Sequence, residues 1–400
     1  MWLYIHELIN KGGYFLENFI YDIPTKVFFG KGQITMLHTI IPDYGKHVLL
    51  VYGSGSIKRN GVYDQVLKEI YKAKAEVQEL SGVEANPQIE TVRKGVQLCE
   101  KFHIDMIIAV GGGSVIDCAK AIAASYGSGK DAWKLIEDPS NISEVLPVIA
   151  VSTMAATGSE MDGIAVISDY KKKEKRPLKH SLIRPKAAIL DPVYTYSVSP
   201  VQTAAGISDI FSHLMETYFS KIEGYMQKRL CEGLMKTCIH NGLLAYNDGN
   251  NYEARANLMW TASWAINDFL KVGQPVTWSV HAIEHQLSAY YDITHGIGLA
   301  VLTPIWMEHI LNESTISDFA RFAREVWDVT EKDNWKAAQE GIKCLRAFFA
   351  KLQLPQTLQQ TGICERTYFE EMAEKALPYL KGTYVPLTKE DIIRIYEKSF

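Results

Sequence analysis

Short, almost continuously apolar segments alternate with amphipathic ones through the first half of the chain, and this alternation limits the possible folds more than any other feature. Segments such as "MIIAV" and "VIAV" have no polar face, which is typical of strands covered on both sides. A parallel sheet with crossover helices covers its strands in this way. We therefore predict strands at residues 26–29, 47–52, 75–80, 105–110, 146–151, 164–168 and 186–190.

The pattern changes after Asp191-Pro192. Long segments with a period of 3.6 residues follow, so the second half should be almost entirely helical. A chain of 400 residues is too long for one ordinary core. We predict an α/β N-terminal domain at residues 1–195 and an all-α C-terminal domain at 196–400. The opening segment lacks the features of a signal peptide, and residues 1–16 could be a non-native or misassigned extension.

A glycine-rich turn follows the fourth predicted strand. Gly111, Gly112, Gly113 and Ser114 stand directly before a helical segment in "IIAVGGGSVIDCAKAIA". Glycines let the backbone approach a phosphate, and the helix N-terminus offers free N–H groups. The spacing is not G-x-G-x-x-G, so the standard dinucleotide motif is absent. An ordinary tight turn is the alternative, but three consecutive glycines cost much chain entropy. We therefore predict phosphate binding.

A second turn, "VYGSGSIKRNG", follows the second predicted strand. It offers small donors with cations close behind: Gly53, Ser54, Gly55, Ser56, Lys58 and Arg59. This stretch contains no acid that could accept a hydrogen bond from the ribose 2′-hydroxyl of NAD(H). Hydroxyls and cations instead suit a 2′-phosphate, so the turn favours NADP(H). One or two charge-assisted hydrogen bonds would give NADPH a preference of roughly tenfold to a thousandfold. A third turn, "STMAATGSE", adds hydroxyls at another strand end, where ligands of open α/β sheets gather.

Histidines and one aspartate form a possible metal site in the second half. Asp209 and His213 are four residues apart, on one face of a helix. His281 and His285 have the same spacing, and His295 follows ten residues later. A carboxylate and imidazoles without thiolates suit Zn²⁺ or Fe²⁺. In one unbroken helix His281 and His295 would lie ~21 Å apart. They can meet only if the helix ends near residue 291 and "DITHG" folds back, so spacing alone slightly prefers His281 with His285.

The stretch "HAIEH" also has the H-x-x-E-H form of a zinc protease, in which Glu284 would take part in hydrolysis. A metal-dependent hydrolase is therefore an alternative function. It leaves the three nucleotide-type turns without a purpose, and on that ground we interpret Glu284 as structural.

Several longer stretches together resemble one family. The most specific are "NPQIETVRKG", "AVGGGSVIDCAKAIA", "ATGSE", "AAILDP", "QTAAGISDIFSHLMETYF" and "HAIEHQLSAYYDITHG". They resemble the iron-containing (group III) alcohol dehydrogenases, in the branch of NADPH-dependent butanol dehydrogenases and aldehyde reductases. The resemblance covers nearly everything after residue 17. It implies a dehydroquinate synthase-like fold, with a Rossmann-like parallel-sheet domain followed by a helical domain.

The resemblance also implies roles for individual residues. The metal ligands would be Asp209, His213, His281 and His295, and His285 would be a non-ligand that relays a proton near the substrate. A packing role is the alternative for His285. The cofactor would contact, besides the second turn, the following residues: Gly112, Gly113, Ser114, Asp117, Thr153, Thr157, Ser159 and Lys175. The assignment of Lys175 rests only on its spacing to Pro185.

The implied reaction is hydride transfer between NADP(H) and a small primary alcohol or aldehyde such as butanol or butanal, at one divalent metal, Fe²⁺ or Zn²⁺. A polyol (glycerol-type) dehydrogenase and a dehydroquinate-synthase-like lyase are alternatives of the same fold, and a catalytically silent nucleotide-binding protein is a third. We also expect a homodimer.

Composition excludes several other classes of protein. A net charge of −4 gives no footprint for nucleic acid or an anionic membrane, and the basic run "KKKEKR" at residues 171–176 is interpreted as a solvated turn. No stretch of about 18 apolar residues could span a membrane. Six widely spaced cysteines without a C-x-x-C pair predict free thiols in a reducing cytoplasm.

Overall fold

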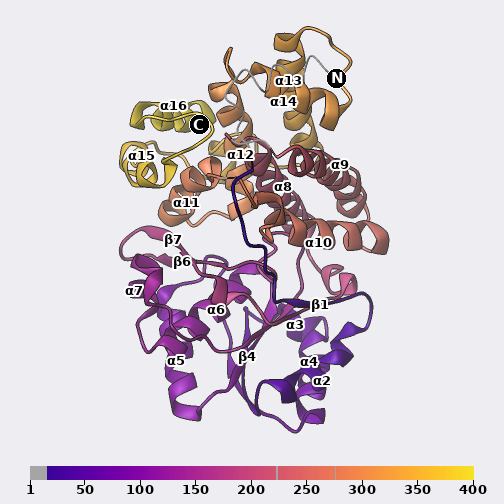
Figure 1. Ribbon diagram of the computed structural model, residues 1–400, viewed down its shortest axis with the longest axis vertical. Coiled ribbons are helices and arrows are strands. Elements are labelled where there is room, and N and C mark those ends of the chain that lie inside the picture. Colours follow the sequence, from indigo (N-terminus) through magenta and orange to yellow (C-terminus); the bar gives the residue numbers. More distant parts are fainter. Residues whose placement is uncertain (1–15, 222–223, 275) are drawn as a thin grey trace.

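The computed structural model describes residues 16–221, 224–274 and 276–400, and Figure 1 shows their arrangement. The expectation about the start of the chain falls almost wholly on residues 1–15, outside the described residues. In Figure 1 the first half of the chain forms a layered α/β unit, and the second half forms a bundle of helices above it. This is the fold class that the sequence predicts.

Six parallel strands form the main sheet, in the order β1-β8-β5-β4-β2-β3. Their bounds are β1 Lys26–Phe29, β2 His47–Tyr52, β3 Glu76–Leu80, β4 Met106–Gly111, β5 Val148–Ser152 and β8 Ala187–Leu190. Each lies within a residue or two of a predicted strand. The connections from β2 and from β4 run toward opposite edges of the sheet, so the chain reverses direction between these two neighbours. Ligands of open α/β sheets bind at such a point.

Alternate residues of β4 enter two different cores, one on each face of the sheet. Ile107 and Ala109 pack with helices on one face, and Ile108 and Val110 pack on the other. The first face is covered by α5 Ile89–Phe102, α6 Gly113–Ser128 and α7 Ala132–Glu137; the second by α2 Leu37–Ile40, α3 Ser56–Arg59 and α4 Val62–Lys72. Covering on both faces is the reason why these strands lack a polar side.

Two strands form a separate hairpin, and here the prediction of a solvated turn at residues 171–176 was only partly correct. β6 Ile164–Asp169 pairs antiparallel with β7 Glu174–Lys179, outside the main sheet. The basic run predicted as a solvated turn is one only at residues 171–173, since 174–176 belong to β7. Lys175 is buried in this strand. Alternation along an antiparallel strand turns every second side chain inward, even in a strongly charged segment.

The second half consists of helices around one large apolar core. They are α8 Pro200–Tyr218, α9 Tyr225–Asn247, α10 Tyr252–Ile266, α11 Ser279–Tyr291, α12 His295–Ile310, α13 Ile316–Trp327, α14 Asn334–Lys351, α15 Phe369–Ala376 and α16 Lys389–Ser399. Short 3-10 helices lie at Gln33–Met36, Ile41–Asp43, Pro139–Asn141, Ser181–Ile183, Pro192–Thr195, Phe269–Lys271, Gln359–Thr361 and Leu377–Leu380. No helix among the described residues is long and apolar enough to cross a membrane. All six cysteines are free.

The helix break needed for a shared metal site is present. Helix α11 ends at Tyr291, and Asp292 adopts a left-handed conformation with φ of 51°. Helix α12 then begins at His295. Its start packs so closely on α8 that a Cβ added to Gly296 would lie 2.0 Å from the carbonyl oxygen of Ala205. Only glycine allows this approach, which brings His295 back toward α8.

Candidate metal and nucleotide site

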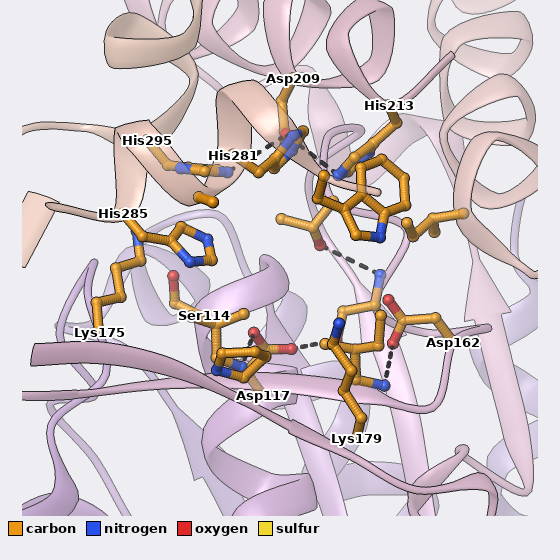
Figure 2. Close-up of a pocket in the computed structure, with 18 of the residues that line it drawn as sticks. Ser114, Asp117, Asp162, Lys175, Lys179, Asp209, His213, His281, His285 and His295 are labelled. Carbon is orange, nitrogen blue, oxygen red and sulfur yellow. Dashed lines mark hydrogen bonds and ion pairs between the residues drawn. The ribbon is translucent and has the colours of Figure 1, made fainter. Parts of the chain in front are cut away.

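Three imidazoles surround one carboxylate oxygen at the base of the helical half (Figure 2). From Asp209 Oδ1 the Nε2 atoms of His213, His281 and His295 lie 3.5, 3.7 and 3.8 Å away. Atoms bound tetrahedrally to one Zn²⁺ would lie about 3.4 Å apart, so a small inward movement would satisfy a cation. Potential ligand atoms of Asp209, His281 and His295 all lie within 4.8 Å of one another.

The chemistry of these atoms also fits a cation. Asp209 Oδ1 and His281 Nε2 are buried, and neither has a hydrogen-bond partner among the described residues. Leaving such atoms unpaired costs stability unless something else binds them. The ring of His213 stacks on that of His281, with centroids 4.8 Å apart, so the two imidazoles present their edges in the same direction. A divalent ion that prefers nitrogen and oxygen ligands fits this group.

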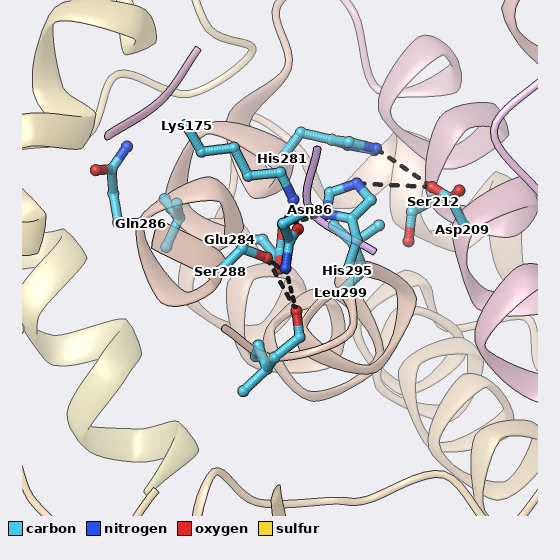
Figure 3. Close-up of polar contacts among 12 residues, drawn as sticks. Asn86, Lys175, Asp209, Ser212, His281, Glu284, Gln286, Ser288, His295 and Leu299 are labelled. Carbon is cyan, nitrogen blue, oxygen red and sulfur yellow. Dashed lines mark hydrogen bonds and ion pairs between the residues drawn. The ribbon is translucent and has the colours of Figure 1, made fainter. Parts of the chain in front are cut away.

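Two buried glutamates hold the other nitrogens of two of these histidines. Glu216, from α8, lies 2.6 Å from His281 Nδ1 and accepts hydrogen bonds from the backbone N–H groups of Val280 and His281. Glu284, from α11, contacts Nδ1 of His295 and accepts from the hydroxyl of Ser288 (Figure 3). A carboxylate at Nδ1 leaves Nε2 free for an ion and fixes the orientation of the ring.

Charges around the site shift the pKa values of its members. Burial alone would raise the pKa of Asp209, but His213 and the other histidines outweigh it and lower the pKa to about 2. Burial lowers the pKa of His213 to about 4. Burial also acts to lower the pKa of His281, but Glu216 outweighs it and raises the pKa to about 9. A cation that binds here must therefore displace a proton from His281.

His285 lies beside this group and lines the same pocket. Its ring centroid is 5.4 Å from that of His295 and 6.4 Å from that of His281. Burial, followed by the charge of Lys175, keeps the pKa of His285 well below its usual value, so the ring is neutral at physiological pH. Glu284, His285 and His295 form a second close trio, but both carboxylate oxygens of Glu284 are already bonded.

The first and third predicted turns meet at the carboxyl edge of the sheet. The backbone N–H of Thr153, after β5, donates to the carbonyl of Gly111, the last residue of β4, at 3.0 Å. A Cβ added to Gly113 would lie 2.2 Å from Thr157 Oγ1, so the glycine lets the turns approach each other. Of the predicted site residues, the pocket is lined by Ser114, Asp117, Thr157, Ser159, Lys175, Asp209, His213, His281, His285 and His295. Gly112, Gly113 and Thr153 lie in the turns behind this lining.

Asp117 and Lys175 already have protein contacts at the site. Asp117 accepts hydrogen bonds from the Ser159 hydroxyl and the Val166 backbone, and burial raises its pKa to about 6. It thus ties α6 to the third turn and to the hairpin. Lys175 Nζ lies 3.9 Å from a carboxylate oxygen of Glu284 (Figure 3), and burial lowers its pKa.

The second turn differs from its prediction in one respect. The turn of Gly53, Ser54, Gly55 and Ser56 lies outside the pocket that holds the histidines, and both serines are exposed. An acid does lie beside it. Glu79, from β3, accepts hydrogen bonds from the hydroxyls of Tyr52 and Tyr63 and lies 3.8 Å from Lys58 Nζ. Burial acts to raise the pKa of Glu79, but these tyrosines and Lys58 outweigh it and lower the pKa, so it is ionised. The turn therefore carries less uncompensated positive charge than the sequence indicates.

Comparison with known proteins decides the family. The profile for "Iron-containing alcohol dehydrogenase" matches residues 24–192, and that for "Fe-containing alcohol dehydrogenase family, C-terminal" matches residues 203–400. The chain belongs to the iron-containing alcohol dehydrogenase family. It is 48% identical over 388 residues to NADH-dependent butanol dehydrogenase A of Clostridium acetobutylicum, covering 96% of this chain and 100% of that protein.

Other members of the iron-containing alcohol dehydrogenases agree. The NADPH-dependent aldehyde reductase YqhD of Escherichia coli is 36% identical over 353 residues, covering 87% of this chain and 90% of that protein. The crystal structure of NADH-dependent butanol dehydrogenase A from Thermotoga maritima superposes with a TM-score of 0.92 at 34% identity, covering 96% and 99% of the two chains. The chain is thus an oxidoreductase of the alcohol dehydrogenase type, and its relatives include both NADH- and NADPH-dependent enzymes.

Sequence reasoning missed the parts of this dehydrogenase site that depend on distant contacts. Glu216 lies 65 residues from His281, and no local pattern connects them. Glu79 lies in β3, far along the chain from the turn beside which it packs. Lys179, which also lines the pocket, follows the basic run and was not singled out by any motif. Only the spacing of Glu284 within "HAIEH" gave a signal, and it suggested a different function.

Proposed function

We propose that this chain is a metal-dependent alcohol dehydrogenase and aldehyde reductase that transfers hydride between NADP(H) and a small primary alcohol or aldehyde such as butanol or butanal. The observation that best supports this proposal is a single pocket. It is lined both by Asp209 with the three histidines around it and by residues of the first and third strand-end turns. Such a pocket can hold a cation and a nicotinamide ring against the same substrate carbon.

The proposed ligands of the cation are Asp209, His213, His281 and His295. A divalent ion bound there supplies Lewis acidity toward the substrate oxygen, and the nicotinamide supplies or accepts the hydride. The glutamates behind His281 and His295 keep Nε2 of each ring directed at the site. His285 stays neutral at physiological pH, so its ring can accept a proton from an alcohol or pass one to the developing alcohol product.

The cofactor preference is the finer part of the proposal. We infer that NADP(H) is accepted through Ser54 and Ser56, whose exposed hydroxyls can donate to a 2′-phosphate. Ionised Glu79 lowers the expected advantage of NADPH to about tenfold or less, because it repels a phosphate and can accept from the 2′-hydroxyl of NADH. Two of the relatives described above carry NADH in their names, which agrees with a small preference.

The proposal is tested with metal-free protein reloaded with Fe²⁺ or Zn²⁺. Oxidation of NADPH and of NADH is followed by absorbance with butanal and with a short polyol aldehyde. Turnover that needs metal and favours butanal supports the proposal, and elemental analysis of unsupplemented protein identifies the ion. A preference for the polyol substrate would move the enzyme to the glycerol-type branch. The hydrolase reading is disfavoured because Glu284 is bonded to His295 and Ser288 and cannot act as a base.

We also infer a homodimer. Strand β1 is an edge of the main sheet, and its Phe29 side chain is 38% exposed beside the ring of Trp260, which is also 38% exposed. An edge strand flanked by exposed aromatic side chains suits pairing with a second copy. Light scattering after size exclusion would test this, and a monomer at micromolar concentration would contradict it.

A further inference from the structure

The wall of the pocket opposite the histidines carries a lysine without an acidic partner. Lys179 ends strand β7 and lines the pocket. Figure 2 shows its side chain extending into the pocket, below the histidine group. Its side chain is exposed to the pocket, and within the ranges that the structure describes its ammonium forms no ion pair. A cation directed into a binding pocket can serve a bound anion.

Neighbouring acids are already neutralised. Asp162 lines the same wall, but it pairs with the fully buried Lys120 and accepts from the backbone of Ile164. Asp268 pairs with Lys271 at 2.5 Å, and its other oxygen contacts Arg184. Within the ranges that the structure describes, both of these carboxylates therefore have cation partners other than Lys179.

The electrostatic effects on Lys179 agree with this lack of an acidic partner. Burial lowers the pKa of Lys179, and the charge of Lys271 lowers it further. Burial lowers the pKa of Lys271 to about 8. Surrounding protein removes part of the hydration of the Lys179 ammonium, and no acid among the described residues acts to raise its pKa, so a bound anion would be stabilised there.

Apolar side chains also line the pocket. Pro177, Ile266, Val276 and Trp278 contribute to the lining that Lys179 shares with the histidines. The pocket thus combines the histidine site, apolar surface and the ammonium of Lys179 in one lining. A ligand that can use all three has a carbonyl or hydroxyl group, a short hydrocarbon chain and an anionic group.

We propose that the enzyme accepts short aldehydes and alcohols whose far end carries a carboxylate, bound by Lys179. This rests on the proposed function, because the pocket must present the reacting carbon to the nicotinamide. The carboxylate would form a charge-assisted hydrogen bond with an ammonium that is partly hydrated, which gives an advantage of about tenfold over the same chain ending in methyl.

The test compares ω-oxo acids of increasing length with the matched unsubstituted aldehydes, using the metal-loaded holoenzyme. At the best length kcat/KM should favour the ω-oxo acid about tenfold, and the advantage should shrink with added salt. Lys179→Met should remove the advantage and Lys179→Arg should retain most of it. Lys94→Met, which alters an exposed lysine on α5, should leave the ratio unchanged. A ratio near one in the unmodified enzyme at every length would overturn the proposal.

Calorimetry separates this proposal from the proposed function. The metal-loaded protein should bind 4-hydroxybutanoate more tightly than butan-1-ol, and Lys179→Met should abolish the difference whether or not turnover is seen. Such a difference without any turnover would refute the dehydrogenase function and keep the anion site. Equal binding of the two alcohols would refute the anion site. Weaker NADPH binding by Lys179→Met would also overturn it, because Lys179 would then serve the cofactor.

Discussion

Replacing Glu216 with glutamine should weaken metal binding while preserving the shape of the site. The carboxylate accepts from His281 Nδ1 at 2.6 Å, from the N–H of His281 at 3.1 Å and from the N–H of Val280 at 3.0 Å. All three partners are donors when Nε2 binds an ion. Glutamine offers one acceptor oxygen, so its NH₂ group must face one of these donors.

The magnitude follows from two losses. Removing the charged partner of a ligating histidine typically costs 10- to 100-fold in metal affinity, or about 1.4–2.7 kcal/mol. A buried N–H left unpaired costs a further ~1–3 kcal/mol in stability. Helix α11 is sensitive to this loss, because its N-cap residue Trp278 makes no side-chain capping bond and Glu216 takes over that role.

The assay is a competition titration of the metal-free protein with Zn²⁺ and a chromophoric chelator at fixed pH. Glu69→Gln is the matched control, because buried Glu69 lies 2.6 Å from Nδ1 of His38 in the other half of the molecule. The Glu216→Gln variant should bind Zn²⁺ at least tenfold more weakly, while the Glu69→Gln variant keeps its affinity. Equal affinities in the two variants would refute the reasoning, and unchanged NADPH binding shows that the fold persists.

Five further substitutions, in three groups, test other parts of the molecule. His285→Ala should keep the bound metal and lose rate, whereas His281→Ala should lose metal and turnover together; metal analysis beside steady-state rates checks both, and metal loss from the first variant would contradict the ligand set. Gly53→Asp has room for its side chain, since the nearest atom to an added Cβ is 3.6 Å away, and it should shift the NADPH/NADH ratio of kcat/KM toward NADH about tenfold. Glu79→Gln should shift that ratio the other way, and an unchanged ratio in both would remove this turn from the cofactor site. The pKa of Lys271 falls from 10.5 to about 8 on folding, so the unfolded chain binds the extra proton between these values and stability should rise with pH there. Urea unfolding at both ends of that range should show this rise reduced in Lys271→Met, and equal slopes would contradict it.

Features that depend on neighbours in the chain could be predicted. The main-sheet strands were located within a residue or two because burial on both faces demands continuous apolar segments. The break after Tyr291 could be expected from "DITHG", in which Asp292 takes the left-handed conformation and Gly296 allows close packing. Each of these is a local response to backbone sterics, which a short stretch of sequence records.

Features that depend on contacts between residues far apart in the chain could not be predicted. Lys175 belongs to the basic run at residues 171–176, whose charge indicates a solvated turn, and Lys179 follows that run. Pairing with β6 instead makes residues 174–179 a strand with an inward face. Glu79 reaches the second turn only because β3 lies beside β2. The prediction that the turn contains no acid was correct for its own residues. It was wrong for the folded protein, because Glu79 of β3 lies beside the turn.

Glu284 shows how one such contact determines function. In a single unbroken helix, the H-x-x-E-H spacing would leave this carboxylate free to act as a base between two histidines. The chain instead ends α11 at Tyr291 and begins α12 at His295, so the last histidine returns to Glu284 and takes its second oxygen. Because a carboxylate bonded to Ser288 and to a ring nitrogen cannot also activate water, the same residues that suggest hydrolysis serve to orient an imidazole. The difference between the two functions therefore depends on the backbone at residues 292–294, and not on the motif itself.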